Sequence, residues 1–232
     1  MMRIAILISG RGSNMLSLAD EVDRLDGTVE ICLVASNTNC AGIVLARERG
    51  LETAIYDRKS HQSREGQENA LAAALERLSV DFIFLAGYMA ILSADFVNRF
   101  PHQIINIHPS LLPAFKGLNT HERAIKDGVS QHGVSVHLVT AALDDGPLLA
   151  QAALDILSTD TPETLANRVL DLEHAIYPTV LNAISTGHLR ILMGTPNWSD
   201  DMFQLEGMPI ETSNILKSAL VWPVQNTVQS DH

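Results

Sequence analysis

The sequence has 232 residues, 46% of them hydrophobic, and a formal net charge of -11 at pH 7. This length is enough for one domain with a sizeable core. The negative charge disfavours a nucleic acid or an anionic membrane as a partner, because phosphate-rich surfaces are held chiefly by clustered Lys and Arg.

The cysteines and the N-terminus indicate the compartment. Cys32 and Cys40 are the only cysteines and form no CxxC motif, which disfavours a disulfide scaffold and a structural zinc site. The apolar run from Ile4 to Ile8 is too short to span a membrane, and no signal-peptide cleavage pattern follows it. We therefore expect a cytoplasmic protein with free thiols.

Strands and helices are expected to alternate along the first hundred residues. Apolar runs predict buried strands at 3–9, 29–35, 53–56 and 80–86. Helices are predicted between and after them, at 15–25, 43–49, 63–78 and 93–100. This rhythm predicts an α/β fold whose parallel strands are joined by right-handed crossovers. Ligands of such sheets bind at the carboxyl ends of the strands.

The turn after the first strand, Gly10-Arg11-Gly12-Ser13-Asn14, predicts an anion site. Free amide groups and the positive end of the helix dipole meet where a glycine-rich turn leads into a helix, and Ser13 or Asn14 suits the N-cap. A dinucleotide is disfavoured, because Met15 replaces the third glycine of that motif and Ser36-Asn37 stands where an acidic residue would bind ribose. We expect the loop to bind a single phosphate; a purely structural tight turn is the alternative.

Two further loops follow strands of this sheet. The apolar loop from Gly87 to Leu92 could line the pocket of a flat aromatic ligand or simply fill the core. After the strand at 103–105, Asn106 and His108 are two residues apart on an extended chain, so they point the same way. A carboxamide can stabilise an oxyanion and an imidazole can carry a proton, so the pair suggests acyl transfer. Satisfaction of backbone groups in a loop is the alternative.

The chain from residue 120 to 154 adds a helix at 120–127 and strands at 133–139 and 148–154, whose short connection predicts an antiparallel hairpin. His132 and His137 are five residues apart and lie on opposite faces of a strand, which disfavours a shared metal. In the hairpin loop, Asp144 is a functional candidate if it reaches His108, where its charge would favour the imidazolium. Asp145 beside Gly146-Pro147 suits a solvated turn.

The C-terminal part begins with a long helix that follows residues 158–163. Glu173 lies at the border of its buried stripe, where it could hold sugar hydroxyls or be exposed. Asn197-Trp198 and Phe203 to Ile210 suggest a small hairpin, and residues 213–232 show no motif that we can interpret. We expect a domain at 1–190 and a C-terminal hairpin and tail at 191–232 that pack on it or trail it.

Four ordered segments resemble those of the phosphoribosylglycinamide formyltransferase family. They are Gly10-x-Gly12-Ser13-Asn14, Gly87-Tyr88-Met89-Ala90-Ile91-Leu92, Asn106-x-His108-Pro-Ser-Leu-Leu-Pro and Leu143-Asp144-x-Gly146-Pro147. The resemblance implies a Rossmann-like formyltransferase fold with a mostly parallel twisted sheet, helices on both faces and a C-terminal antiparallel portion. It also implies a purine-biosynthesis enzyme, a monomer or homodimer, that transfers a formyl group from the co-substrate 10-formyltetrahydrofolate to the amine of glycinamide ribonucleotide without a metal.

Residue by residue, the resemblance implies a catalytic group of Asn106, His108 and Asp144. Asn106 and protonated His108 would stabilise the tetrahedral oxyanion, and Asp144 would support the charged imidazole. The implied contacts to the acceptor's phosphate and ribose are Gly12, Ser13, Asn14 and Glu173. The implied folate contacts are Arg64, Met89, Ala90, Ile91, Leu92, Val139 and Leu143. The residues implied to shape the site are Ser110, Gly117, His121, Ser135 and His137.

Two positions depart from the family pattern. Ala90 stands where Arg is usual, which removes a side-chain contact and leaves the backbone contacts to folate, and Leu170 replaces a more usual polar residue one turn before Glu173. The alternatives are a formyltetrahydrofolate hydrolase, a methionyl-tRNA formyltransferase and a noncatalytic folate- or phosphate-binding module. The start at the first strand, the length and the acidity disfavour the first two, and the intact catalytic group disfavours the third.

Overall fold

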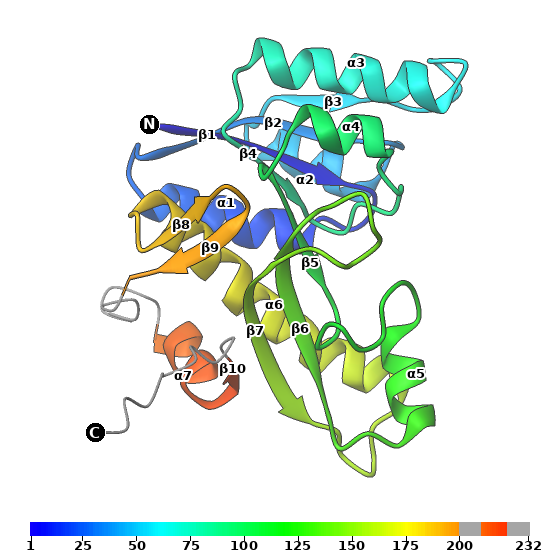
Figure 1. Ribbon diagram of the computed structural model, residues 1–232, viewed down its shortest axis with the longest axis vertical. Coiled ribbons are helices and arrows are strands. Elements are labelled where there is room, and N and C mark those ends of the chain that lie inside the picture. Colours follow the sequence, from blue (N-terminus) through cyan, green and yellow to red (C-terminus); the bar gives the residue numbers. More distant parts are fainter. Residues whose placement is uncertain (200–209, 222–232) are drawn as a thin grey trace.

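Strands and helices alternate along the chain in the computed structural model, which describes residues 1–199 and 210–221 (Figure 1). The first half contains β1 (Met2–Ile8), α1 (Ser13–Arg24), β2 (Val29–Ser36), α2 (Ala41–Glu48), β3 (Thr53–Ile55), α3 (Arg64–Arg77), β4 (Phe82–Leu85), α4 (Ala94–Arg99) and β5 (Ile104–His108). The second half contains α5 (Thr120–Asp127), β6 (Gln131–Leu138), β7 (Leu148–Asp155), α6 (Pro162–Ser185), β8 (Leu189–Leu192), β9 (Thr195–Trp198), α7 (Ile210–Ala219) and β10 (Leu220–Val221). The elements predicted up to α6 are found, and most of their ends differ by no more than two residues. The exception is β5, which extends three residues further than predicted, so Asn106 and His108 lie within the strand and not in the loop after it.

Within the described residues, eight strands form one sheet in the order β10-β7-β6-β5-β4-β1-β2-β3. The pairs from β3 to β5 are parallel, as expected for strands joined by helical crossovers. The pairs β5–β6, β6–β7 and β7–β10 are antiparallel. The mostly parallel sheet with a C-terminal antiparallel portion is therefore confirmed, including the hairpin of β6 and β7.

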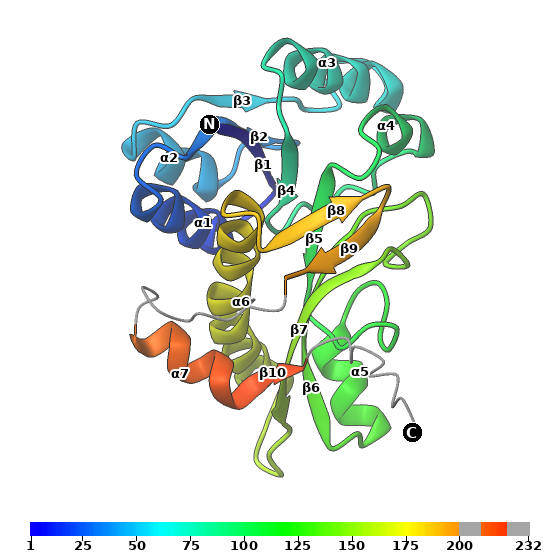
Figure 2. The same ribbon diagram turned by 60° about the vertical axis from the view of Figure 1, so that its left-hand side comes forward.

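Helices cover both faces of this sheet (Figures 1 and 2). On one face, α1, α2 and α6 bury Leu18, Ile43 and Ile176 against the sheet. On the other face, α3 and α4 bury Leu71 and Phe96. Strands covered on both sides are nearly continuously apolar, which is why β1 could be recognised as a buried strand from its sequence.

The long helix α6 fixes the carboxyl ends of two central strands. Thr161 caps its N-terminus in a capping box with Thr164, and Pro162 occupies the first turn. Tyr177 is fully buried, and its hydroxyl lies 3.0 Å from both the Leu85 and the Ile105 carbonyl oxygens. The helix thus contacts the last residue of β4 and, in β5, the residue that precedes Asn106.

The start of α1 differs from the prediction. Neither Ser13 nor Asn14 is the N-cap; that position is Gly12, with φ +85° and, among the described residues, no side-chain cap. A Cβ on Gly12 would lie 2.7 Å from the Gly42 Cα, so the turn requires glycine for both its conformation and its close approach to α2. Ser13 and Asn14 are therefore the first residues of the helix.

The C-terminal region also differs from the prediction. Asn197-Trp198 does belong to a hairpin, but β9 pairs antiparallel with β8, with Leu189 opposite Trp198. Residues 203–209 of the expected second arm lie outside the described residues. Ile210, the last residue of that arm, begins α7 and not a strand. Residues 213–221, in which no motif was found, continue α7 beside α6 and form the edge strand β10 (Figure 2). The expected division between residues 190 and 191 falls inside β8 and stays a prediction.

Over residues 1–199 and 210–221, none of the helices combines the length and the apolar character needed to cross a membrane.

Candidate active site

The carboxyl ends of β1, β4 and β5 lie side by side, where the strand order reverses between β1 and β4. The loops that follow β1 and β4 touch: the Met89 amide donates a hydrogen bond to Ser9 Oγ at 2.9 Å, and Ser9 Oγ donates to Asn37 Oδ1 at 2.6 Å. The glycine-rich turn, the Gly87–Leu92 loop and the end of β5 therefore share one edge of the sheet.

His108 is the last residue of β5, and both nitrogens of its imidazole face oxygen atoms. Nδ1 lies 3.5 Å from Asp144 Oδ2, and Nε2 lies 3.1 Å from the Phe115 carbonyl oxygen. The side chains of His108 and Asp144 are only 8% and 9% exposed, so water screens their attraction weakly. Because a carbonyl oxygen only accepts hydrogen bonds, Nε2 carries a proton, and Nδ1 faces the carboxylate.

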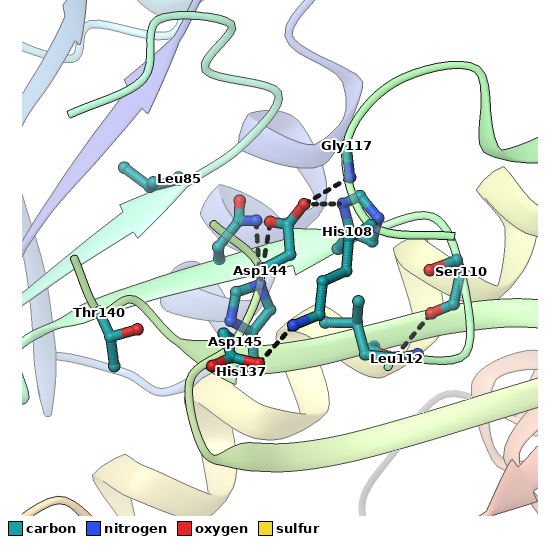
Figure 3. Close-up of polar contacts among 12 residues, drawn as sticks. Leu85, His108, Ser110, Leu112, Gly117, His137, Thr140, Asp144 and Asp145 are labelled. Atoms are coloured by element: carbon teal, nitrogen blue, oxygen red, sulfur yellow. Dashed lines mark hydrogen bonds and ion pairs between the residues drawn. The ribbon is translucent and has the colours of Figure 1, made fainter. Parts of the chain in front are cut away.

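Asp144 is held in place by its backbone and by a second loop (Figure 3). The Gly117 amide donates to Asp144 Oδ2 at 2.8 Å. The backbone of Asp144 has φ +46°, a left-handed conformation that Asp tolerates better than most residues and that is concentrated at functional sites. Its neighbour Asp145 is exposed and pairs with Lys116, as expected for a solvated turn acid.

Asn106 is paired with His137 across the sheet, since the two residues are opposite each other in the β5–β6 register. Asn106 Nδ2 lies 3.2 Å from His137 Nε2, and His137 Nδ1 lies 2.9 Å from the Leu138 carbonyl oxygen. Burial lowers the pKa of His137, so the neutral ring donates from Nδ1 and accepts at Nε2. One N–H of the Asn106 carboxamide is thus directed to His137, and the other, which has no partner among the described residues, can donate to a ligand.

His121 and His132 form a second pair of histidines beside α5. His132 Nε2 lies 3.2 Å from His121 Nδ1, and burial lowers the pKa of both, that of His132 to about 4. His137 contacts Asn106 and Asp144 instead, so His132 and His137 do not converge on a common point. Among the described residues, no group of three or more His, Cys, Asp or Glu side chains could hold a metal ion.

The turn that leads into α1 is joined to α6. Asn14 Nδ2 donates a hydrogen bond to Glu173 Oε2 at 2.6 Å, which brings together two residues 159 positions apart. Burial raises the pKa of Glu173, while the Asn14 hydrogen bond and the nearby Arg11 charge oppose the shift. Ser13 is half-buried in the first turn of the helix, where amide groups have no partner within the helix. These features agree with both interpretations of the loop, a structural tight turn and an anion site, so the anion site stays a prediction.

The residues implied to contact folate lie in two segments of the chain. Arg64 is bonded to the Gly87–Leu92 loop, and Val139 and Leu143 belong to the segment between β6 and β7. Arg64 Nη2 donates to the Ile91 carbonyl oxygen at 2.5 Å, and Met89 and Ile91 are 70% and 66% exposed, so these two side chains do not fill the core. Leu92 and Val139 pack against one apolar cluster. Ala90 is half-buried and Leu143 is 53% exposed beside Gly117.

Sequence reasoning missed two contributors to this site. Phe115 supplies its carbonyl oxygen to His108, and no side-chain pattern marks such a contact. Gln151 is buried beneath the loop that follows His108. A polar residue within the apolar strand Leu148–Asp155 was the available signal for Gln151.

The fold and the comparisons with known proteins define a formyltransferase. Residues 2–181 match the Formyl transferase family, and the chain belongs to it. Phosphoribosylglycinamide formyltransferase of Haemophilus influenzae is 36% identical over 214 residues, which cover 92% of this chain and 98% of that protein. The Escherichia coli protein of the same name is 37% identical over 192 residues, covering 82% and 90%.

Solved structures agree with these relatives. Glycinamide ribonucleotide transformylase 1 from Symbiobacterium toebii is 38% identical, with a TM-score of 0.81 over 86% of this chain and 95% of that one. Phosphoribosylglycinamide formyltransferase from Anaplasma phagocytophilum is 39% identical, with a TM-score of 0.78 and the same coverage. The resemblance drawn from the four sequence segments and the expected fold are both confirmed.

Proposed function

We propose that this protein transfers the formyl group of 10-formyltetrahydrofolate to the amine of glycinamide ribonucleotide. The observation that carries the proposal is the pair of His108 and Asp144, with His108 Nδ1 3.5 Å from Asp144 Oδ2. Asn106 is connected to this pair through His137, whose Nε2 lies 3.2 Å from Asn106 Nδ2 and 3.8 Å from Asp144 Oδ1. A carboxamide donor, a proton carrier and a supporting carboxylate are the groups that acyl transfer to an amine requires. Relatives named phosphoribosylglycinamide formyltransferase support the choice of acceptor.

In the proposed reaction, the lone pair of the acceptor amine forms a bond to the formyl carbon, and the carbonyl π electrons move to oxygen. The free N–H of Asn106 and the protonated His108 stabilise this oxyanion. The carbonyl then re-forms as the bond to the folate nitrogen breaks. His108 Nδ1 gives its proton to that nitrogen and then takes the proton that the attacking nitrogen loses, while Nε2 stays bonded to the Phe115 carbonyl oxygen. Asp144 stabilises the imidazolium through its charge.

The acceptor would bind at the turn before α1. Its phosphate would accept hydrogen bonds from the amides of Gly12, Ser13 and Asn14, with the positive end of the helix dipole adding attraction. Glu173 lies next to this turn through its bond to Asn14, and its carboxylate would accept hydrogen bonds from the ribose hydroxyls. Leu170, where a polar residue is usual, contributes no such bond.

The folate would bind along the exposed apolar side chains of the Gly87–Leu92 loop and beside Val139 and Leu143. Backbone groups of this loop would serve its polar edges, because Ala90 offers no polar side chain. The guanidinium of Arg64 is already bonded to the Ile91 carbonyl, so it is placed to add a positive charge at the same loop. Holding both substrates at one edge adds the advantage of proximity.

Replacement of His108 tests the proposed mechanism. In His108→Ala, the binding of glycinamide ribonucleotide and of a folate should change little, whereas kcat should fall by about 10²- to 10⁴-fold, the usual contribution of general acid–base catalysis. Binding is measured by calorimetry and turnover by the formylated product. Full turnover in this variant would contradict the mechanism.

A further inference from the structure

A row of polar residues crosses the antiparallel part of the sheet from His108. Ser135 on β6 is opposite His108 on β5, and Gln151 on β7 is opposite Ser135. Residues in direct register on neighbouring strands point to the same face. The row therefore extends from the imidazole, through a buried hydroxyl, to a buried carboxamide two strands away.

The side chains of Gln151 and Ser135 are bonded to the backbone of the loop that follows His108. Gln151 Nε2 donates to the Leu112 carbonyl oxygen at 2.9 Å and to Ser135 Oγ at 2.8 Å. Ser135 Oγ accepts from the Leu112 amide at 3.0 Å and donates to the Ser110 carbonyl oxygen at 2.6 Å. Both N–H groups of Gln151, and the donor and both acceptor sites of Ser135, are thus used.

This loop provides one backbone contact to His108 and one to Asp144, the pair of side chains on which the proposed mechanism depends. A few residues beyond Leu112, the Phe115 carbonyl oxygen accepts from His108 Nε2, and the Gly117 amide donates to Asp144 Oδ2. The loop is stiffened further by the bond from Ser110 Oγ to the Ala114 carbonyl oxygen at 2.7 Å. A shift of the backbone at residues 110–114 would therefore reach both members of the pair.

We propose that Gln151 is a positioning residue of the formyl transfer reaction, which acts through Ser135 and loop 110–117 on His108 and Asp144. The inference rests on the proposed catalytic role of His108. Without the carboxamide, the Leu112 carbonyl and the Ser135 hydroxyl each lose a buried partner, and such groups move to find another. The loop then no longer fixes the orientation of the imidazole.

The test is Gln151→Met, which keeps the length of the side chain and removes its donors, with Gln131→Met as the matched control. Gln131 is exposed on the adjacent strand and bonds to Asp155, away from the loop. In Gln151→Met, kcat should fall by about ten- to a hundredfold, the scale expected for a misplacement of up to 1 Å, while KM for each substrate changes less than about threefold. The control should match the unaltered protein.

A spectroscopic measurement separates positioning from a general loss of stability. The His108 Nε2 proton, donated to the Phe115 carbonyl, should give a protected NMR resonance in the unaltered protein and in Gln131→Met. In Gln151→Met this resonance should shift or exchange with water, at a temperature where circular dichroism shows the protein folded. Unchanged kcat together with an unchanged resonance would overturn the proposal.

Two further variants complete the test. Ser135→Ala breaks the same connection without adding bulk, so it should lower kcat similarly, and the double variant should be no worse than the more damaged single variant, because the two residues act in series. If Gln151→Met does not fold, Ser135→Ala decides by the same two readouts. Inactive His108→Ala with fully active Ser135→Ala would overturn the positioning role alone, whereas active His108→Ala would overturn the proposed mechanism itself.

Discussion

Asp144→Asn is the substitution whose effect the structure determines most closely. The change removes one negative charge 3.5 Å from His108 Nδ1 and keeps the shape of the side chain. The Asn carbonyl can still accept the Gly117 amide, which donates to Oδ2 at 2.8 Å, so the loop contact is retained. The variant therefore isolates the charge from the geometry.

The size of the effect follows from the distance and the burial. Two unit charges 3.5 Å apart attract by about 5 kcal/mol at an effective dielectric constant of roughly 20, and by about 1 kcal/mol in bulk water. Because the two side chains are largely buried, the attraction that is lost should lie between these two limits, at about 2–4 kcal/mol. If the transition state depends on the imidazolium, kcat should fall by about 30- to 1,000-fold.

The assay is the initial rate of formylated product with both substrates saturating. Asp145→Asn is the matched control, since Asp145 is the adjacent residue, is exposed and pairs only with Lys116 among the contacts found for it. Its kcat should stay within about twofold of the unaltered protein, because exposed ion pairs contribute little. A fall of less than threefold in Asp144→Asn, or an equal fall in Asp145→Asn, would refute the reasoning.

Three more predictions concern the acceptor, pH and the fold. Glu173→Gln should raise KM for glycinamide ribonucleotide by about 10- to 100-fold with little change in kcat, as for a lost charged hydrogen bond; a lower kcat at unchanged KM would contradict this. Because burial lowers the pKa of His132 from 6.5 to about 4, this side chain binds more protons in the unfolded chain between these pH values, so His132 alone should lower the free energy of unfolding by roughly 2–3 kcal/mol as pH falls from 6.5 to 4. Urea titrations of His132→Gln should show a shallower pH dependence, and an identical slope would count against the assignment. Tyr177→Phe, which removes the hydroxyl at the Leu85 and Ile105 carbonyls, should lower the unfolding free energy by about 1–3 kcal/mol in the same titration; no loss would show that the bonds are not needed.

The hydrophobic periodicity predicted those strands and helices whose formation depends mainly on their own residues. β1 is apolar throughout because it is buried on both faces. The stripe of Leu165, Val169 and Ile176 identified α6 because one face of the helix is buried against the sheet. The N-cap of α1 was predicted wrongly, because the close contact of Gly12 with Gly42 depends on a second helix. The pairing of β9 with β8 was not predicted, because strand pairing depends on two segments and not on the residues of one.

The candidate site divides in the same way. Asn106 and His108 could be found because their spacing on a strand makes them point together, and Asp144 could be named only as a residue that had to reach His108. The contacts of Phe115 and Gln151 could not be deduced, because a carbonyl has no sequence signature and because the Gln151 contact requires the register of three strands. Local pattern predicts which residues can do chemistry, and register decides which of them meet.

The most direct test of formyl transfer is one incubation of the purified protein with 10-formyltetrahydrofolate, with and without glycinamide ribonucleotide. We expect tetrahydrofolate and formylated glycinamide ribonucleotide to form at equal rates when both substrates are present, and no loss of the formyl group without the acceptor. Release of formate without the acceptor would indicate a hydrolase, and no reaction under either condition would indicate a binding protein. Either result would contradict the proposed function.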